Sequence, residues 1–113
     1  MRILLITNDW LPKKGGISTY LTNLVSSVDH EFTIYAPSWA EGDDVINSSS
    51  SFFLNSKDTI KEISDIIKNK NIDIILHGSS NPQFLLIDKL DQISNINSPK
   101  NIKIPQFMIC HGA

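Results

Sequence analysis

Apolar residues are arranged along the chain in two patterns that alternate. An apolar run without alternation predicts that residues 2–7 are a strand buried on both faces, and the mainly apolar segments 31–37, 72–76 and 104–110 are predicted to be further strands. Between these runs, apolar residues recur every three or four positions, which is typical of a helix that packs one face on a sheet. Strands that alternate with helices predict βαβ units, and therefore a parallel sheet with right-handed crossovers.

This spacing predicts three helices. The first begins near Ile17, the second near Thr59, and the third at Asn81-Pro82, an N-cap residue followed by proline. Thr59 and Glu62 have the spacing of a capping box. The expected buried stripes are Ile17, Tyr20, Leu21, Leu24, Val25 and Val28; Ile60, Ile63, Ile66 and Ile67; and Leu86, Leu90 and Ile93. The polar stretch 38–51 is expected to be a mobile loop and residues 52–54 a short edge strand.

The expected architecture is a three-layer α/β/α domain, doubly wound around a parallel sheet. The last predicted strand ends within a few residues of Ala113, whereas a doubly wound domain normally continues there with a helix. We therefore expect residues 1–113 to be the front part of a longer unit, truncated after a strand.

Composition narrows the class of protein. A chain of 113 residues with 41% hydrophobic and 19% charged residues is about one globular domain. A formal charge of −2 argues against general electrostatic binding to nucleic acid. The single cysteine, Cys110, cannot form an internal disulfide, and no metal-ligand spacing is present. With no apolar run long enough to span a bilayer and no signal peptide, we expect a cytoplasmic protein.

The segment "LPKKGGISTY", residues 11–20, carries the most informative chemistry. It joins the first strand to the first helix, and it lies at the carboxyl edge of the sheet, where such folds bind ligands. Gly15 and Gly16 would let a phosphate approach the positive helix N-terminus, with Lys13 and Lys14 adding charge. The alternative is a tight corner in which glycine only permits the turn. A P-loop and a G-x-G-x-x-G dinucleotide fingerprint are both excluded, because neither pattern is present.

Other candidates lie in the loops at the same predicted edge. His111 follows a buried strand and precedes a glycine, so it either faces the crevice or caps the strand end. His77 has the same context, and there the strand-end interpretation is favoured. Trp10 and Trp39 either stack on a sugar, face a lipid or cover the core.

The segments "MRILLITNDWLPKKGGISTYLTNLVSSV", "IDIILHGSSNP" and "FMICHGA" together resemble a known family. It is the N-terminal domain of retaining GT-B glycosyltransferases, with the closest likeness to family-4 enzymes of the mannosyltransferase type. The likeness covers nearly the whole chain in order. It combines a P-x-x-GG-I turn with a late strand that ends in His-Gly. It implies a Rossmann-like fold for residues 1–113, which would be the acceptor-side half of the GT-B fold.

The resemblance also implies roles for individual residues. Gly15 and Gly16 would approach the donor diphosphate, and His111 would contact the donor sugar near the reacting centre. Loops around Trp10, Lys14, Trp39 and Ser79 would be on the acceptor side. The family transfers a sugar from a nucleotide-sugar with retention, usually without a protein-bound metal or other cofactor. A lipid-linked acceptor would bring the protein into peripheral contact with the inner face of a membrane.

The second domain of the family is absent from this sequence. That domain binds the nucleotide and carries basic residues and an E-x7-E motif. Residues 1–113 are therefore not expected to catalyse transfer alone, and they need the missing C-terminal domain or a partner chain. They would be a fragment, a split subunit or an inactive remnant. The alternative outside this family is a non-catalytic binding module of flavodoxin-like or receiver-like fold.

Overall fold

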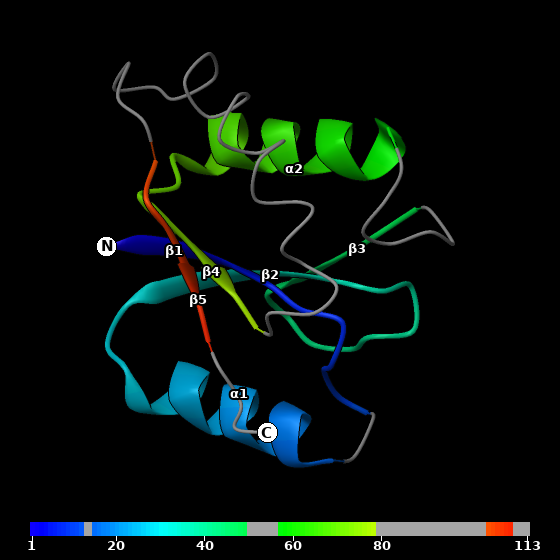
Figure 1. The fold of residues 1–113 in the computed structure, drawn as a ribbon, viewed down its shortest axis with the longest axis vertical. Coiled ribbons are helices and arrows are strands. Elements are labelled where there is room, and N and C mark those ends of the chain that lie inside the picture. Colours follow the sequence, from blue (N-terminus) through cyan, green and yellow to red (C-terminus); the bar gives the residue numbers. More distant parts are fainter. Residues whose placement is uncertain (13–14, 50–56, 79–103, 110–113) are drawn as a thin grey trace.

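The computed structural model describes residues 1–12, 15–49, 57–78 and 104–109. Its elements, in chain order, are β1 (Arg2–Ile6), α1 (Gly16–Ser27), β2 (Glu31–Ala36), β3 (Val45–Asn47), α2 (Lys57–Lys70), β4 (Ile74–His77) and β5 (Gln106–Met108) (Figure 1). The four predicted strands and the first two predicted helices are all present. The predicted strand at 52–54 and the helix from Asn81 lie outside the described residues.

The five strands form one parallel sheet in the order β3-β2-β1-β4-β5. The chain moves outward from β1 to β2 and β3, and then crosses to β4 on the other side of β1. Helices α1 and α2 cover opposite faces of the sheet (Figure 1). This arrangement confirms the doubly wound, three-layer fold and puts its topological switch point between β1 and β4.

Alternate residues of the strands pack into two separate hydrophobic cores, one on each face of the sheet. On the α2 face, Leu4 and Ile6 of β1 pack with a cluster that includes Ile63 and Ile67. On the α1 face, Leu5 packs with a cluster that includes Leu21. The α2 stripe agrees with the predicted spacing. On α1, Tyr20 is 50% exposed, contrary to prediction, and Ser18 is buried instead. Ser18 lies one turn before Leu21 on the same side of the helix, whereas Tyr20 is turned away from it.

Two further expectations were wrong. The stretch 38–51 contains β3, because Val45 and Ile46 pair with Ile34 and Tyr35 at the edge of the sheet. The capping box is also absent. α2 begins at Lys57, so Thr59 is already inside the helix and fully buried. A box read from spacing alone cannot tell an N-cap threonine from one that packs inward two residues later.

Candidate functional site at the carboxyl edge of the sheet

The carboxyl ends of the parallel strands are tied together by backbone hydrogen bonds. Gly78 N–H donates to Ile6 O at 2.8 Å, and Thr7 N–H donates to Tyr35 O at 3.1 Å. Ligands of doubly wound sheets bind beyond this edge, next to the switch point. The segments that follow β1, β2 and β4 therefore form the candidate site, and the sheet fixes the backbone that leads into them.

Thr7 and Gly78 bring β1 and β4 close together at the switch point. A Cβ on Gly78 would lie 2.8 Å from Thr7 Oγ1, closer than real contacts allow, and 3.0 Å from Leu21 Cδ1, which is also tight. Thr7 Oγ1 also accepts from Asp9 N–H at 3.0 Å and donates to Asp9 O at 2.9 Å. The same threonine therefore packs on β4 and shapes the first turn after β1.

The glycine turn, Gly15-Gly16, begins α1 with open space around it. Gly15 is the N-cap residue, has an extended backbone (φ 169°, ψ 170°), and accepts from Thr19 N–H at 3.0 Å. Within the part of the chain that the structure describes, a Cβ added to either glycine would have no neighbouring atom within 4 Å. Neither the backbone conformation nor the packing requires glycine at these two positions.

The first turn of α1 has no charge partner of its own. It holds no acidic residue, and Gly15 supplies no side-chain cap. Ser18, in the same turn, is only 2% exposed, and its Oγ has no hydrogen-bond partner among the described residues. The free N–H groups and positive dipole of such a helix end favour an anion. An anionic ligand could therefore reach the turn through the space that the glycines leave open.

The two tryptophans lie on neighbouring loops but differ in exposure. Trp10 is 6% exposed and packs in the α1-face core with Ala40, an environment that favours its interpretation as a cover for the core. Trp39, between β2 and β3, is 43% exposed and available to a ligand. Lys14, Ser79 and His111 lie outside the described residues, so their predicted roles stay predictions.

His77 is a buried histidine at the end of β4. Its Nε2 donates to Gln106 Oε1 of β5 at 2.8 Å, while Nδ1 has no hydrogen-bond partner among the described residues. Burial lowers the pKa of His77, and the hydrogen bond to Gln106 opposes this only in part. The ring is therefore neutral and holds β5 against β4, as the strand-end interpretation expected. Its partner Gln106 could not be identified from sequence spacing.

We expect acid to destabilise the fold through His77. Because burial depresses the pKa of the folded state, the contribution of His77 to stability is full above 6.5, the ordinary histidine pKa, and is lost as the pH falls below it. Chemical denaturation between pH 7.5 and 5 measures the slope of the unfolding free energy. His77→Gln should flatten that slope, whereas the exposed control His30→Gln should leave it unchanged. An unchanged slope in His77→Gln would contradict the assignment.

A second buried polar group, Tyr35, links β2 to α2 on the α2 face of the sheet. Tyr35 Oη donates to Glu62 Oε1 at 2.7 Å, and Ser49 N–H donates to the same oxygen at 3.2 Å. Burial, the largest effect, raises the pKa of Tyr35 to about 12. Both partners of the Tyr35–Glu62 hydrogen bond serve the packing of α2 on the sheet. The spacing that suggested a capping box thus belongs to a tertiary contact.

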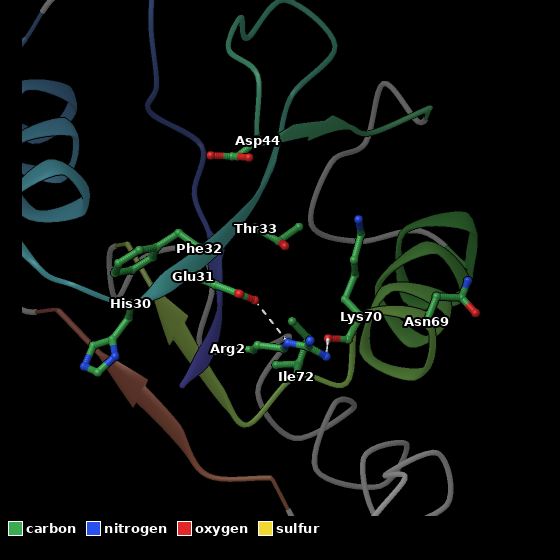
Figure 2. Close-up of a pocket in the computed structure, with 9 residues that line it drawn as sticks. All are labelled: Arg2, His30, Glu31, Phe32, Thr33, Asp44, Asn69, Lys70 and Ile72. Carbon is green, nitrogen blue, oxygen red and sulfur yellow. Dashed lines mark hydrogen bonds and ion pairs between the residues drawn. The ribbon is translucent and has the colours of Figure 1, made fainter.

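Two hollows lie at the opposite, amino-terminal end of the strands. One has a volume of about 470 Å³ and is lined by Arg2, Glu31, Lys70 and their neighbours (Figure 2). A second, of about 560 Å³, adjoins it. Arg2 Nε pairs with Glu31 Oε2 at 3.1 Å, and its Nη1 donates to Lys70 O at 3.4 Å. The guanidinium already has protein partners, and the hollow lies away from the glycine turn, so its size alone does not make it the candidate site.

The described part of the chain lacks two other kinds of feature. It contains no group of three or more histidine, cysteine, aspartate or glutamate residues that could hold a metal ion. None of its helices is long and apolar enough to cross a membrane.

A Rossmann-like sheet with an open helix N-terminus beside its switch point defines a class of ligand-binding α/β domain. No protein-family model matches the chain. It does match GDP-mannose-dependent alpha-(1-6)-phosphatidylinositol monomannoside mannosyltransferases. The proteins from two strains of Mycobacterium tuberculosis are 32% identical to it over an alignment of 100 residues, covering 75% of this chain and 26% of the relative.

The protein of the same description from Mycolicibacterium smegmatis is 28% identical over 97 residues, covering 74% of this chain and 25% of the relative. The chain thus spans about a quarter of the length of the curated relatives that it matches. These matches confirm the resemblance to GT-B glycosyltransferases of the mannosyltransferase type.

Proposed function

We propose that this chain is the acceptor-side part of a retaining glycosyltransferase. The reaction moves a sugar, mannose by analogy with the relatives, from a nucleotide-sugar such as GDP-mannose to a sugar or lipid-linked acceptor. The bond between the anomeric carbon and the donor phosphate oxygen breaks, and a bond to an acceptor hydroxyl oxygen forms on the same face of the sugar. The proton of the acceptor hydroxyl passes to the departing phosphate oxygen, and the nucleoside diphosphate leaves.

The observation that carries this proposal is the glycine turn. Among the described residues, neither the backbone conformation nor packing requires glycine at positions 15 and 16, and no side chain caps the start of α1. A departing diphosphate gains negative charge, and a helix N-terminus stabilises that charge without reorganising. These features favour a role of the turn in binding the donor diphosphate over a purely structural role.

The other roles follow from the resemblance and from position on the loops. His111 would contact the donor sugar, and Lys14, Trp39 and Ser79 would be on the acceptor side; Trp10 would act from beneath Trp39's loop. No resident metal or other cofactor is included. Residues 1–113 would need the nucleotide-binding domain for transfer. A lipid-linked acceptor would make the protein peripheral at the cytoplasmic face of a membrane.

A transfer assay tests this function. The full-length protein is incubated with radiolabelled GDP-mannose and phosphatidylinositol monomannoside, and label in the lipid fraction is measured. We expect label to accumulate, and His111→Ala should lower turnover while leaving the denaturation midpoint unchanged. The exposed control His30→Ala should transfer at the parental rate. Absence of both transfer and nucleotide-sugar binding would overturn the proposed function, and unchanged turnover in His111→Ala would remove His111 from the site.

A further inference from the structure

Residues 37–44, between β2 and β3, form a loop that is held by hydrogen bonds and by packing on the core. We call it the β2–β3 loop. It starts with a turn in which Ala40 N–H donates to Pro37 O at 3.0 Å. Pro37 and Ala40 are both buried, and Ala40 packs in the α1-face core. The loop is therefore anchored to the core at its middle as well as joined to strands at its ends.

Asn47 of β3 holds this turn from the side. Its Nδ2 donates to Pro37 O at 2.9 Å and to Ala40 O at 2.9 Å. One amide group thus spans the turn and satisfies two loop carbonyls at once. A carboxylate or an alkyl side chain at this position would supply no donor to either carbonyl.

The β2–β3 loop is also attached to the segment that leads to the glycine turn. Glu41 N–H donates to Leu11 O at 2.8 Å. Gly42 has a φ of 152°, which residues with side chains rarely adopt, and a Cβ there would lie 3.5 Å from Trp10 Nε1. Buried Trp10 therefore supports the loop from below. Movement of the loop would also disturb Leu11 and Trp10, four to five residues before the glycines.

The chemistry that the loop displays fits a polyhydroxylated ring. Trp39 presents an exposed indole, whose flat apolar face can stack on the C–H face of such a ring. The exposed carboxylates of Glu41 and Asp43 can accept hydrogen bonds from hydroxyl groups. The same negative charges oppose contact with an anionic bilayer. The loop is thus better suited to the ring of an acceptor than to the surface of a membrane.

We propose that Asn47 is a positioning residue for acceptor binding. It holds the β2–β3 loop in one conformation and so keeps Trp39 against the sugar or inositol ring of the acceptor. The part that concerns the acceptor rests on the proposed function, whereas the hold on the loop does not. Preorganisation of this kind improves binding because the loop has less freedom to lose when the ligand arrives.

Hydrogen–deuterium exchange tests the hold on the loop. In the full-length protein, Asn47→Ala should speed exchange in peptides that cover residues 37–44 by about tenfold or more. Pro37 O, which accepts from Ala40 N–H, would no longer be fixed, and the freed loop could draw Glu41 N–H away from Leu11 O. Exchange in β1 and β4 should not change. The control Asn23→Ala, at an exposed position on α1, should leave the loop unchanged. Unchanged exchange of residues 37–44 in Asn47→Ala, or faster exchange across the whole sheet, would overturn the positioning role.

Kinetics separate positioning from general damage. Asn47→Ala should raise the KM for the acceptor about threefold to tenfold, with kcat and the KM for GDP-mannose within about twofold of the parent. Trp39→Ala should raise the acceptor KM similarly without loosening the loop. If both residues act through one contact, the double variant should be little worse than either single variant. Equal increases in both KM values, or additive effects in the double variant, would overturn the proposal.

A binding measurement tests the contact between Trp39 and the ring separately from the proposed transfer activity. The indole Nε1–H resonance of Trp39 should shift with methyl α-mannoside or myo-inositol, whether or not transfer is detected, and the shift should shrink in Asn47→Ala. Absence of any shift would overturn the ring contact. Sugar-free phosphatidylglycerol vesicles should leave the resonance unchanged. A response to these vesicles instead of the sugars would show that Trp39 contacts a bilayer, and would also overturn the proposal.

Discussion

Replacing Gly16 with alanine is expected to lower sugar transfer on the order of a hundredfold without weakening the fold. The added methyl group would stand at the start of α1, where no atom of the described residues lies within 4 Å of it. Alanine also has a higher helix propensity than glycine, by up to about 1 kcal/mol. Stability should therefore stay the same or rise, while the methyl group obstructs the approach of the diphosphate to the helix N–H groups.

The measurement pairs turnover with chemical denaturation of the full-length protein. Gly15→Ala should behave in the same way, because its extended backbone suits alanine and its surroundings are equally open. Ser26→Ala, at an exposed position near the other end of α1, is the matched control, and its turnover should be unchanged. Parental turnover in both glycine variants would mean that the turn is only a corner, and would remove the diphosphate assignment.

The sequence predicted the fold well because its strongest signals are local. Unbroken apolar runs such as Leu4–Ile6 can be buried on both faces only inside a parallel sheet, and the structure places them there. The i, i+3, i+4 spacing of Ile63, Ile66 and Ile67 was enough to orient α2. The predictions agree with the structure wherever the spacing of apolar residues along an element determines which of its faces is buried.

The wrong predictions concern residues whose structure depends on a contact with a residue far away in the sequence. β3 is three residues long and surrounded by polar residues, so only its pairing with Ile34 and Tyr35 makes it a strand. Glu62 had the spacing of a capping residue, but its carboxylate accepts a hydrogen bond from the hydroxyl of Tyr35, which lies on the strand that α2 packs against. Tertiary contacts of this kind override local signals, and no single-sequence pattern encodes them.

The location of the candidate site was easier to predict from the sequence than the residues that form it. The carboxyl edge follows from the parallel sheet alone, and glycines marked the points of close approach. Asn47 was not predicted, because its two acceptors are backbone carbonyls that any sequence would supply. Gly78 differs from the glycine turn in a way that only the structure reveals, since one glycine serves packing and the other two do not.

That difference predicts an opposite result for Gly78→Ala, which should destabilise the protein by about 1–3 kcal/mol. The new Cβ would meet Thr7 Oγ1 at 2.8 Å, Thr7 Cβ at 2.9 Å and Leu21 Cδ1 at 3.0 Å. Thr7 cannot move aside easily, because its hydroxyl is bonded to both backbone groups of Asp9. Leu21 is fully buried in the α1-face core and has little room to shift.

Urea denaturation of the Gly78→Ala and Gly16→Ala variants under one set of conditions checks this contrast. We expect a lower midpoint for Gly78→Ala, and an unchanged or higher midpoint for Gly16→Ala. Combining Gly78→Ala with Leu21→Val should cost less than the sum of the two single changes, because the shorter side chain withdraws one of the crowding atoms. If Gly78→Ala were as stable as the parent, β1 and β4 would have room to separate at the switch point. The close approach of Thr7 to Gly78 would then not be a fixed feature of the candidate site.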